Sequence, residues 1–184
     1  MRVITGSARG MKLQTLDGLA TRPTSDKVKE AIFSILQFEL EGRKVLDLFA
    51  GSGQLGIEAL SRGARHAVFV EQSPAAAKVI LANLKHTKLS EQATVRTMTA
   101  ADFLKGCRER FDVILMDPPY HENLLESTLN RISEIDILSE GGIIVCERPD
   151  SLSLPAEIGR FTKAKDYRYG KTGVTVYRSG SVCL

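Results

Sequence analysis

Apolar residues in this chain first recur at helical spacing and then gather in short runs. One set is spaced by three and four positions, which predicts an amphipathic helix: Val28, Ala31, Ile32, Ile35, Leu36 and Leu40. Thr24, Ser25 and Asp26 precede it with side chains that can cap a helix. Apolar runs then predict strands at Val45–Phe49, Ala67–Glu71, Ala93–Thr97, Phe111–Met116 and Ile143–Glu147. Helices are expected between them at Gln54–Arg62, Ser73–Leu84, Ala100–Gly106 and Asn123–Glu134. This alternation indicates an α/β fold with a mostly parallel sheet covered on both faces.

Both ends of the chain carry the pattern of hairpins. Arg2–Gly6 and Met11–Thr15 flank a turn that has glycine at each end, which predicts a short β-hairpin. Thr162–Tyr169 and Val174–Arg178 flank Gly170–Gly173 and predict a closing antiparallel hairpin. We therefore expect a basic N-terminal extension over residues 1–24, one main domain over 25–180 and a tail over 181–184.

Charge is distributed unevenly along the 184 residues. The formal net charge is +3, but residues 1–29 carry +4 and residues 160–178 carry +5, which leaves −6 for the rest. Two basic ends suggest that a polyanion docks on them, while the acidic centre suits a different ligand. Ordinary solvated lysines and arginines are the alternative interpretation of the same charges.

Metal, disulfide and membrane classes receive no support from the sequence. Cys107, Cys146 and Cys183 form no CxxC pair, so no zinc site or disulfide framework is expected. No run approaches the roughly 18 apolar residues of a membrane span, and the N-terminus has no apolar leader. The expectation is a cytoplasmic protein that needs no metal and does not contact a membrane.

A glycine-rich turn follows the first predicted strand. Gly51-x-Gly53-x-x-Gly56 lies between that strand and a helix, where a ligand can approach the backbone. The same spacing occurs in dinucleotide sites, but Asp47 would repel a pyrophosphate there. A sulfonium amino acid carries an ammonium group, which Asp47 would attract, and Glu71 at the end of the next strand could accept both ribose hydroxyls. The motif therefore favours a methyl donor over a dinucleotide.

Four segments in order resemble the motifs of class I S-adenosylmethionine-dependent methyltransferases. They are Asp47-Leu-Phe-Ala-Gly-Ser-Gly53, Glu71, Ala101-Asp102-Phe103 and Asp117-Pro-Pro-Tyr120. The resemblance implies a Rossmann-like, seven-stranded sheet that binds S-adenosylmethionine and releases S-adenosylhomocysteine. The cofactor-binding residues that it implies are Asp47, Phe49, Gly51, Gly53, Glu71, Gln72, Asp102 and Phe103.

Further segments resemble one family within that class, the RsmD family. They are Arg2-x-Ile-x-Gly-x-x-Arg-Gly-x-Lys-Leu13, Arg22-Pro-Thr-x-Asp26, Glu30-Ala-Ile-Phe-Ser-Ile-Leu36 and Tyr169-Gly-Lys-Thr172. The resemblance spans residues 2–178 and implies methylation of a guanine N2 of the guanine 966 type in small-subunit (16S) ribosomal RNA. Expected partners are that RNA or the assembling small subunit, and the protein is expected to act as a monomer. Two positions depart from the pattern: Gln54, where a small apolar residue is expected, and the unmatched tail from Ser179 to Leu184.

The Asp117-Pro118-Pro119-Tyr120 segment also makes chemical sense. An exocyclic amine is a poor nucleophile because its lone pair is delocalised into the ring. The Asp117 carboxylate and the Pro118 carbonyl could accept both amine hydrogens, on a backbone that two prolines hold rigid. Tyr120 offers a face on which an extruded base can stack. We expect these four residues to be catalytic.

Contacts to RNA phosphates are expected from Arg2, Arg9, Lys12 and Arg22. His121 follows this segment and could also contact substrate, and the alternative is that it has no catalytic role. Three rival functions stay open. They are methylation of adenine N6 or of another amino group, an oxidoreductase that uses a dinucleotide, and a non-catalytic RNA-binding protein that keeps the fold.

Overall fold

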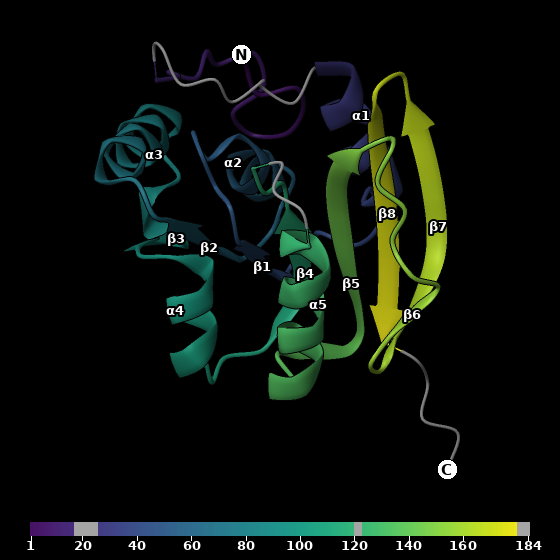
Figure 1. The fold of residues 1–184 in the computed structure, drawn as a ribbon. Helices are drawn as coiled ribbons and strands as arrows, with labels where there is room; N and C mark the ends of the chain where they lie inside the picture. The colour runs from purple at the N-terminus through teal and green to yellow at the C-terminus, as the bar shows by residue number, and fades with distance from the viewer. Residues whose placement is uncertain (17–25, 120–122, 180–184) are drawn as a thin grey trace.

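Eight strands form one sheet in the order β3-β2-β1-β4-β5-β8-β7-β6, seen in the computed structural model, which describes residues 1–16, 26–119 and 123–179 (Figure 1). The pairs β1–β2, β2–β3, β1–β4 and β4–β5 are parallel, and the pairs that involve β6, β7 and β8 are antiparallel. The strands are β1 Lys44–Asp47, β2 His66–Glu71, β3 Ala93–Thr97, β4 Phe111–Met116, β5 Leu138–Pro149, β6 Glu157–Ile158, β7 Phe161–Tyr169 and β8 Thr172–Ser179. The predicted α/β class, parallel sheet and closing hairpin are confirmed.

In the described part of the chain, one α-helix precedes β1, and the other four alternate with the parallel strands as predicted. The helices are α1 Asp26–Ile35, α2 Gln54–Ser61, α3 Pro74–Thr87, α4 Ala100–Gly106 and α5 Leu124–Ile135. Ser73 caps α3, because its hydroxyl accepts a hydrogen bond from the Ala76 amide at 3.3 Å. Thr99 caps α4 in the same way, through the amide of Asp102 at 3.1 Å.

Two details of the predicted sheet are wrong. The sheet has eight strands where seven were expected, because the two-residue β6 pairs with the start of β7 and is too short to show any alternation. β5 begins five residues earlier than predicted, since Gly141 and Gly142 interrupt the apolar run without ending the strand. The pairing of β4 and β5 shifts register between Phe111 and Val113, which accommodates the irregular stretch.

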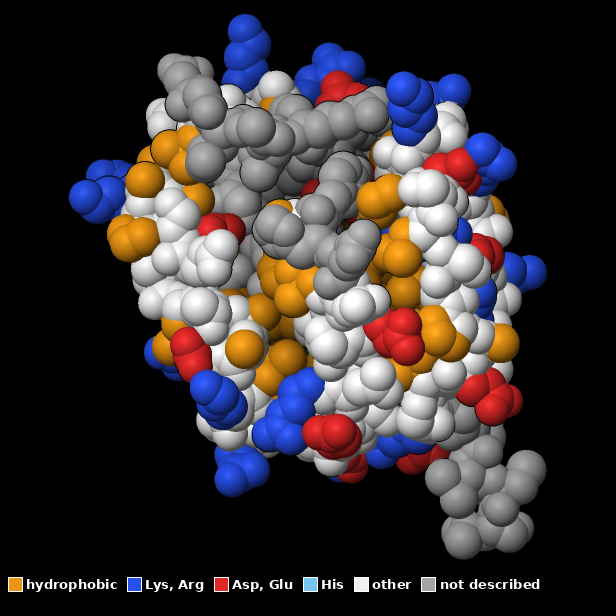
Figure 2. All heavy atoms as spheres, viewed as in Figure 1, with side chains coloured by type: hydrophobic (Ala, Val, Ile, Leu, Met, Phe, Trp, Pro, Cys, Tyr) orange, Lys and Arg blue, Asp and Glu red, His pale blue; other side chains and the backbone are white. Residues whose placement is uncertain are grey.

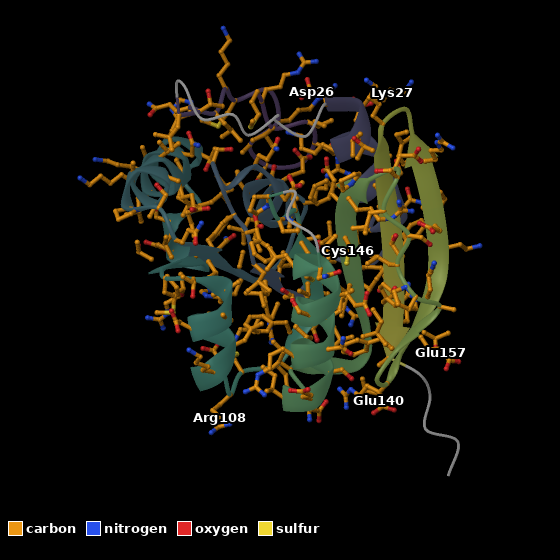
Figure 3. All side chains as sticks on the ribbon, viewed as in Figure 1. Asp26, Lys27, Arg108, Glu140, Cys146 and Glu157 are labelled. Carbon is orange, nitrogen blue, oxygen red and sulfur yellow. The ribbon has the colours of Figure 1, made fainter. Side chains whose placement is uncertain are left out.

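Helices cover both faces of the sheet, and each face has its own apolar core. On one face, side chains of α1, α2 and α3 pack on residues such as Val45, Phe69 and Val113. On the other face, α4 and α5 pack on residues such as Leu46, Val68 and Ile114. Alternate residues of a strand point to opposite faces, so each central strand contributes to both cores. Figure 3 shows charged side chains at the two ends of the strands, with Lys27 at one end and Arg108 and Glu140 at the other.

The N-terminal segment, residues 1–16, contains less strand than predicted. One isolated antiparallel bridge joins Arg2 and Lys12, in place of two strands. Gly6 has φ +90° and Gly10 has φ +81°, which is the conformation for which the glycines were singled out. Val3, Ala8 and Leu13 are buried in the core that contains α1, α2 and α3. Their burial means that the segment packs on the domain instead of projecting from it.

Several predicted features lie outside the described residues. These are Arg22, Tyr120, His121, the capping residues Thr24 and Ser25, and the tail over 181–184. Among the helices of the described ranges, none has the length and apolarity to cross a membrane.

Candidate active site

The acidic residues singled out in the sequence gather at one edge of the sheet. Asp47 is the last residue of β1 and is paired in register with Phe69 of β2 and Leu115 of β4. Glu71 and Asp117 therefore follow two residues beyond those partners, at the carboxyl ends of the two neighbouring strands. The order of strands reverses direction between β1 and β4, and such a switch point is where open α/β sheets bind ligands.

Asp47 is buried, and its two carboxylate oxygens are in different environments. Its Oδ2 accepts a hydrogen bond from the Gly56 amide at 2.9 Å, whereas Oδ1 has no hydrogen-bond partner among the described residues. Burial raises the pKa of Asp47 to about 7, and the charges of Asp117 and Glu71 act in the same direction. The Gly56 amide opposes the shift. A buried carboxylate with one oxygen unpaired is suited to a cationic ligand.

The glycines of the turn each have a structural reason. Gly51 has φ +54° and Gly53 has φ +80°, so both adopt a backbone conformation that other residues rarely adopt. Gly56 has ordinary dihedrals, but a Cβ there would lie 2.2 Å from the Phe69 ring. α2 can therefore approach β2 closely, which brings its N-terminus to the end of β1.

Glu71 is fixed by backbone amides on both of its oxygens. Oε2 accepts from the Gly51 amide and Oε1 from the Ser73 amide, each at 2.8 Å. A carboxylate oxygen can accept more than one hydrogen bond, so both keep capacity for a ligand hydroxyl. The carboxylate is preorganised, as a ribose-binding acid would need to be.

The other side chains expected to bind the cofactor are less enclosed. Asp102, in the first turn of α4, is exposed, and it accepts from Lys105 Nζ at 2.9 Å and from the Thr99 hydroxyl at 2.8 Å. These hydrogen bonds, with Lys105 the larger contributor, lower the pKa of Asp102. Phe49 and Phe103 are partly buried against the α4–α5 core, and Gln72 is exposed. The four residues lie on the loops and the helix start at this edge of the sheet.

The segment predicted to be catalytic leaves β4 at the same edge. Asp117 is half-buried, Pro118 is buried and Pro119 is exposed. Asp117 lies close enough to Asp47 for its charge to raise the pKa of that carboxyl. The structure thus brings three of the predicted acids together, while Tyr120 lies outside the described residues.

The residues present fit an amino-acid sulfonium cofactor. Asp47 Oδ1 offers a buried acceptor to an ammonium group, and Glu71 offers an anchored carboxylate to a ribose. Gln54, the residue that departs from the expected pattern, is buried, and its Oε1 also has no partner among the described residues. Acidic side chains at the strand ends disfavour a pyrophosphate, which argues against a dinucleotide.

Buried polar side chains hold the backbone of the N-terminal segment, and the sequence analysis missed them. Glu58 of α2 accepts from the Ile4 amide at 2.7 Å and from the Thr5 amide at 3.0 Å. Lys29 of α1 donates to the Arg2 carbonyl at 2.5 Å and lies 3.8 Å from Glu58. Burial lowers the pKa of Lys29, and the Glu58 charge opposes that shift. Only long-range folding brings these residues together, although a lysine on the apolar side of a predicted helix was a signal.

The two basic ends of the chain differ in the structure. Arg2, Arg9 and Lys12 are exposed, and none forms an ion pair with another described residue. In the C-terminal group, by contrast, Arg160, Lys163, Arg168 and Arg178 pair with Asp136, Asp166, Asp150 and Glu39. Figure 2 shows basic side chains along the edge of the molecule that carries the N-terminal segment. The N-terminal group is the better candidate for binding phosphates.

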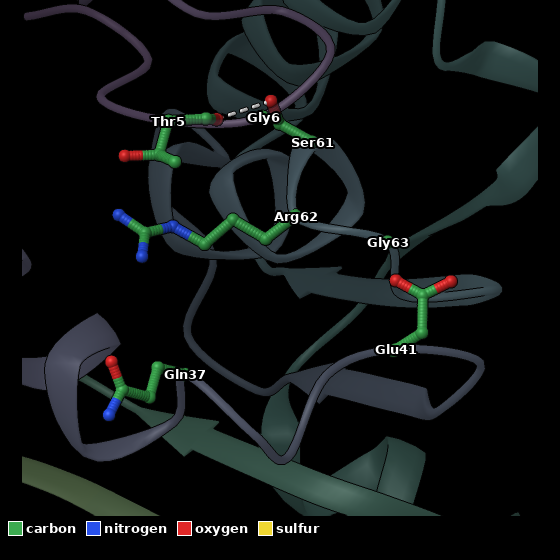
Figure 4. A pocket seen from close by; sticks show the side chains of 7 residues that line it. All are labelled: Thr5, Gly6, Gln37, Glu41, Ser61, Arg62 and Gly63. Atoms are coloured by element: carbon green, nitrogen blue, oxygen red, sulfur yellow. Dashed lines mark hydrogen bonds between the residues drawn. The ribbon is translucent and has the colours of Figure 1, made fainter.

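A hollow of about 560 Å³ lies away from this edge (Figure 4). It is lined by Thr5, Gly6, Gln37, Glu41, Ser61, Arg62 and Gly63. These residues surround the C-terminal end of α2, whereas the glycine turn lies at its N-terminal end. None of the predicted site residues lines this hollow.

Comparisons with known proteins agree with the motifs. The model of the family "Conserved hypothetical protein 95" matches residues 1–178. A Bacillus subtilis protein named "Putative rRNA methyltransferase YlbH" is 42% identical over 181 residues, which cover 97% of this chain and 98% of that protein. The Haemophilus influenzae "Ribosomal RNA small subunit methyltransferase D" is 38% identical over 97% of this chain and 92% of its own length. The solved structure of yhhF from Escherichia coli superposes with a TM-score of 0.89 at 31% identity and covers 97% of both chains.

Proposed function

We propose a function from one premise: this chain belongs to the RsmD family, whose model, Conserved hypothetical protein 95, spans residues 1–178. Its cofactor is S-adenosylmethionine, and it methylates ribosomal RNA. The finer assignment that we propose is the exocyclic N2 of a guanine, of the guanine 966 type, in small-subunit ribosomal RNA. The observation that carries methyl transfer to an exocyclic amine is the meeting of Asp47, Glu71 and the Asp117-Pro118 backbone at one edge of the sheet. Similarity to a relative named as a small-subunit ribosomal RNA methyltransferase supports the RNA as substrate.

Asp47 and Glu71 divide the binding of the cofactor between them. Asp47 Oδ1 would accept from the ammonium group, and Glu71 would accept from the ribose hydroxyls. Phe49, Phe103 and Asp102 would surround the adenine. Gly51, Gly53 and Gln72, in the loops after β1 and β2, would lie along the bound cofactor. When bound, S-adenosylmethionine supplies an electrophilic methyl group on a positively charged sulfur.

Asp117 and Pro118 would orient the guanine amine. The carboxylate and the carbonyl each accept one amine hydrogen, which turns the nitrogen lone pair out of conjugation. The new N–C bond forms as the S–C bond breaks, S-adenosylhomocysteine leaves, and the nitrogen gives up one proton, for which we assign Asp117 as acceptor. Tyr120 would stack on the extruded base. Electrostatics and positioning supply the acceleration, without a covalent enzyme intermediate.

RNA would dock on the N-terminal segment through the exposed Arg2, Arg9 and Lys12, with Arg22 as a further contact. A small domain has little surface for reading sequence, so we propose that it recognises RNA shape and an unpaired base.

The test is methylation of unmodified small-subunit RNA, both naked and in partly assembled particles, with a labelled methyl donor. Digestion and chromatography should give N2-methylguanosine at one position. N6-methyladenosine as the product, or no label in either form of the RNA, would overturn the assignment.

The docking surface needs its own variants. Charge reversal at Arg9 and Lys12 together should lower RNA affinity about tenfold or more at moderate salt, because each phosphate contact releases counterions. Charge reversal at Arg65 and Arg108 together is the matched control, since both are exposed and precede β2 and β4 at the opposite end of the strands, where Figure 3 labels Arg108. An equal loss in both variants would show a general charge effect and would remove the N-terminal segment from the interface.

A further inference from the structure

Asn83 lies on α3 with its side chain between two parts of the site. It is 1% exposed, although it is a polar residue in the middle of a helix. Its Nδ2 donates to the Ser52 carbonyl in the glycine turn at 3.0 Å. The same amide donates to the Gln14 carbonyl at 3.0 Å and accepts from the Gln14 amide at 2.8 Å. One buried side chain therefore joins the cofactor turn to the N-terminal segment.

The contact on the cofactor side fixes a particular peptide. The Ser52 carbonyl accepts from Asn83, and the amide of the same peptide unit, that of Gly53, donates to the Ala50 carbonyl at 2.7 Å. Both polar ends of this peptide are thereby held. Ile80, one turn earlier on the same face of α3, lies 3.2 Å from where a Cβ on Gly53 would be. α3 thus sets the orientation of the turn on which the cofactor would rest.

The contact on the other side fixes the end of the basic segment. Asn83 satisfies both the amide and the carbonyl of Gln14, which follows Leu13 in the core and Lys12 on the surface. A second link runs in parallel, because the Ser52 hydroxyl lies 3.5 Å from the Met1 sulfur. Any movement of the Ser52 carbonyl therefore changes the hydrogen bonds that hold Gln14.

We propose that Asn83 is a positioning residue that couples the cofactor turn to the basic N-terminal segment. Binding of the cofactor then orders the segment, and RNA on the segment stabilises the turn by the same factor, since coupling between two sites is reciprocal. The RNA half of this coupling rests on the proposed function, while the cofactor half does not. The structure offers a contiguous path of hydrogen bonds from the Ser52 carbonyl to Gln14, and networks of this kind can carry coupling between two sites.

Hydrogen–deuterium exchange of the full chain with S-adenosylhomocysteine tests the cofactor half without RNA or turnover. In the wild type, ligand should slow exchange over residues 49–56 and also over residues 11–16. In Asn83→Ala, ligand should still slow exchange over residues 49–56 but no longer over residues 11–16. Asn83→Ser provides a second, polar variant in case the alanine variant does not fold.

Thr87→Val is the matched control. Thr87 is a buried polar residue one turn further along α3, and its hydroxyl bonds only to the Asn83 and Leu84 carbonyls within the helix. Thr87→Val should lower the free energy of unfolding, but ligand should still slow exchange over residues 49–56 and over residues 11–16. The proposal is overturned if residues 11–16 show no slowing in the wild type, or if Asn83→Ala and Asn83→Ser retain it.

An RNA arm separates this proposal from the proposed function. S-adenosylhomocysteine should raise the RNA affinity of the wild type roughly fivefold or more, and Asn83→Ala should lose that factor. If the wild type binds no ribosomal RNA while S-adenosylhomocysteine still slows exchange over residues 11–16, the substrate assignment fails and the link through Asn83 stands. If RNA binds and the factor survives in Asn83→Ala, the link fails and the substrate assignment stands.

Discussion

The acidic edge of the sheet and the basic N-terminal segment are held in place by different means. At the edge, the contacts are local: the Gly56 amide binds Asp47 nine residues away, and the Gly51 amide binds Glu71 twenty residues away. In the segment, the side chains that hold the backbone come from residues far away along the chain. Glu58 is 54 residues from Ile4 along the chain, and Asn83 is 69 residues from Gln14.

The edge therefore depends less on the rest of the molecule than the N-terminal segment does. The edge uses backbone amides of its own turns, so its geometry follows once β1 and β2 pair. The segment has backbone hydrogen bonds of its own around the Arg2–Lys12 bridge, such as that from the Val3 amide to the Met11 carbonyl, but side chains of α1, α2 and α3 hold it on the domain. A substitution at the edge that leaves the Ser52 carbonyl in place should therefore keep the segment intact, whereas a change in the helices should loosen it.

Asp117→Asn gives the largest expected effect and breaks the edge alone. Methyl transfer should fall about 10²–10³-fold, because a preorganised acceptor for the amine is weakened. Affinity for S-adenosylhomocysteine should stay within about threefold because Asn is isosteric with Asp. Affinity for RNA should also stay within about threefold because residues other than Asp117 hold the N-terminal segment in place. Single-turnover rates and equilibrium binding measure the two separately.

The control for that variant lies on the same strand. Asp112→Asn is at the other end of β4, where Asp112 accepts from the Lys44 amide at 2.8 Å. It should leave the transfer rate within about twofold. A rate for Asp117→Asn that equals that of Asp112→Asn would remove Asp117 from the reaction.

Glu58→Gln should break the segment and spare the edge. It leaves the buried Lys29 without its counter-charge, and removal of one partner of a buried pair costs about 3–5 kcal/mol, so we expect a loss of about 3 kcal/mol in the free energy of unfolding. RNA affinity should fall because the Ile4 and Thr5 amides lose one acceptor, while cofactor affinity should change little. Denaturant unfolding and binding of each ligand measure these effects.

Glu39→Gln provides the comparison for Glu58. Glu39 pairs with Arg178 and Arg43 near the surface, where an ion pair contributes about 0–1 kcal/mol. If the two variants lose equal stability, Lys29 and Glu58 do not anchor the segment.

The same contrast explains what the sequence could predict. Asp47, Glu71 and Asp117 follow apolar strands directly, so their meeting at one edge follows from parallel pairing alone. The bounds predicted for β3, β4 and α4 match the structure to the residue, because the patterns that predict them are local. Local signals of this kind need no knowledge of distant contacts.

The anchors of the N-terminal segment could not be found in that way. Lys29 was counted with the basic surface residues, yet it is buried against Glu58, because the segment closes over both. Asn83 is one amide in a helix, and only the packing of α3 against Ser52 and Gln14 gives it a role. Likewise, the acids that neutralise the C-terminal basic residues come mostly from other elements.

The smallest expected effect is a pH dependence of cofactor binding at the edge, which the titration of Asp47 should cause. Burial raises its pKa to about 7, so in the free protein the neutral carboxyl is favoured below that pH. An acid whose folded-state pKa is raised contributes stability at low pH that is lost as pH rises from about 4 to about 7. The ammonium group of S-adenosylhomocysteine needs the charged form of Asp47, so affinity for this ligand should rise up to about tenfold per pH unit from pH 5 to pH 7 and then level off. Isothermal titration across this range should also record proton release.

Asp47→Asn and Asp102→Asn decide whether that slope belongs to Asp47. Asp47→Asn removes the titrating group but keeps an acceptor for the Gly56 amide, so binding should be weaker at pH 8 and nearly flat with pH. Asp102 is exposed and has a lowered pKa, so it stays ionised throughout, and Asp102→Asn should keep the wild-type slope. If Asp102→Asn flattens the profile and Asp47→Asn does not, the charge that the ligand meets lies on α4 and not at the end of β1. The local contacts of Asp47 would then support the fold of the turn without attracting the cofactor.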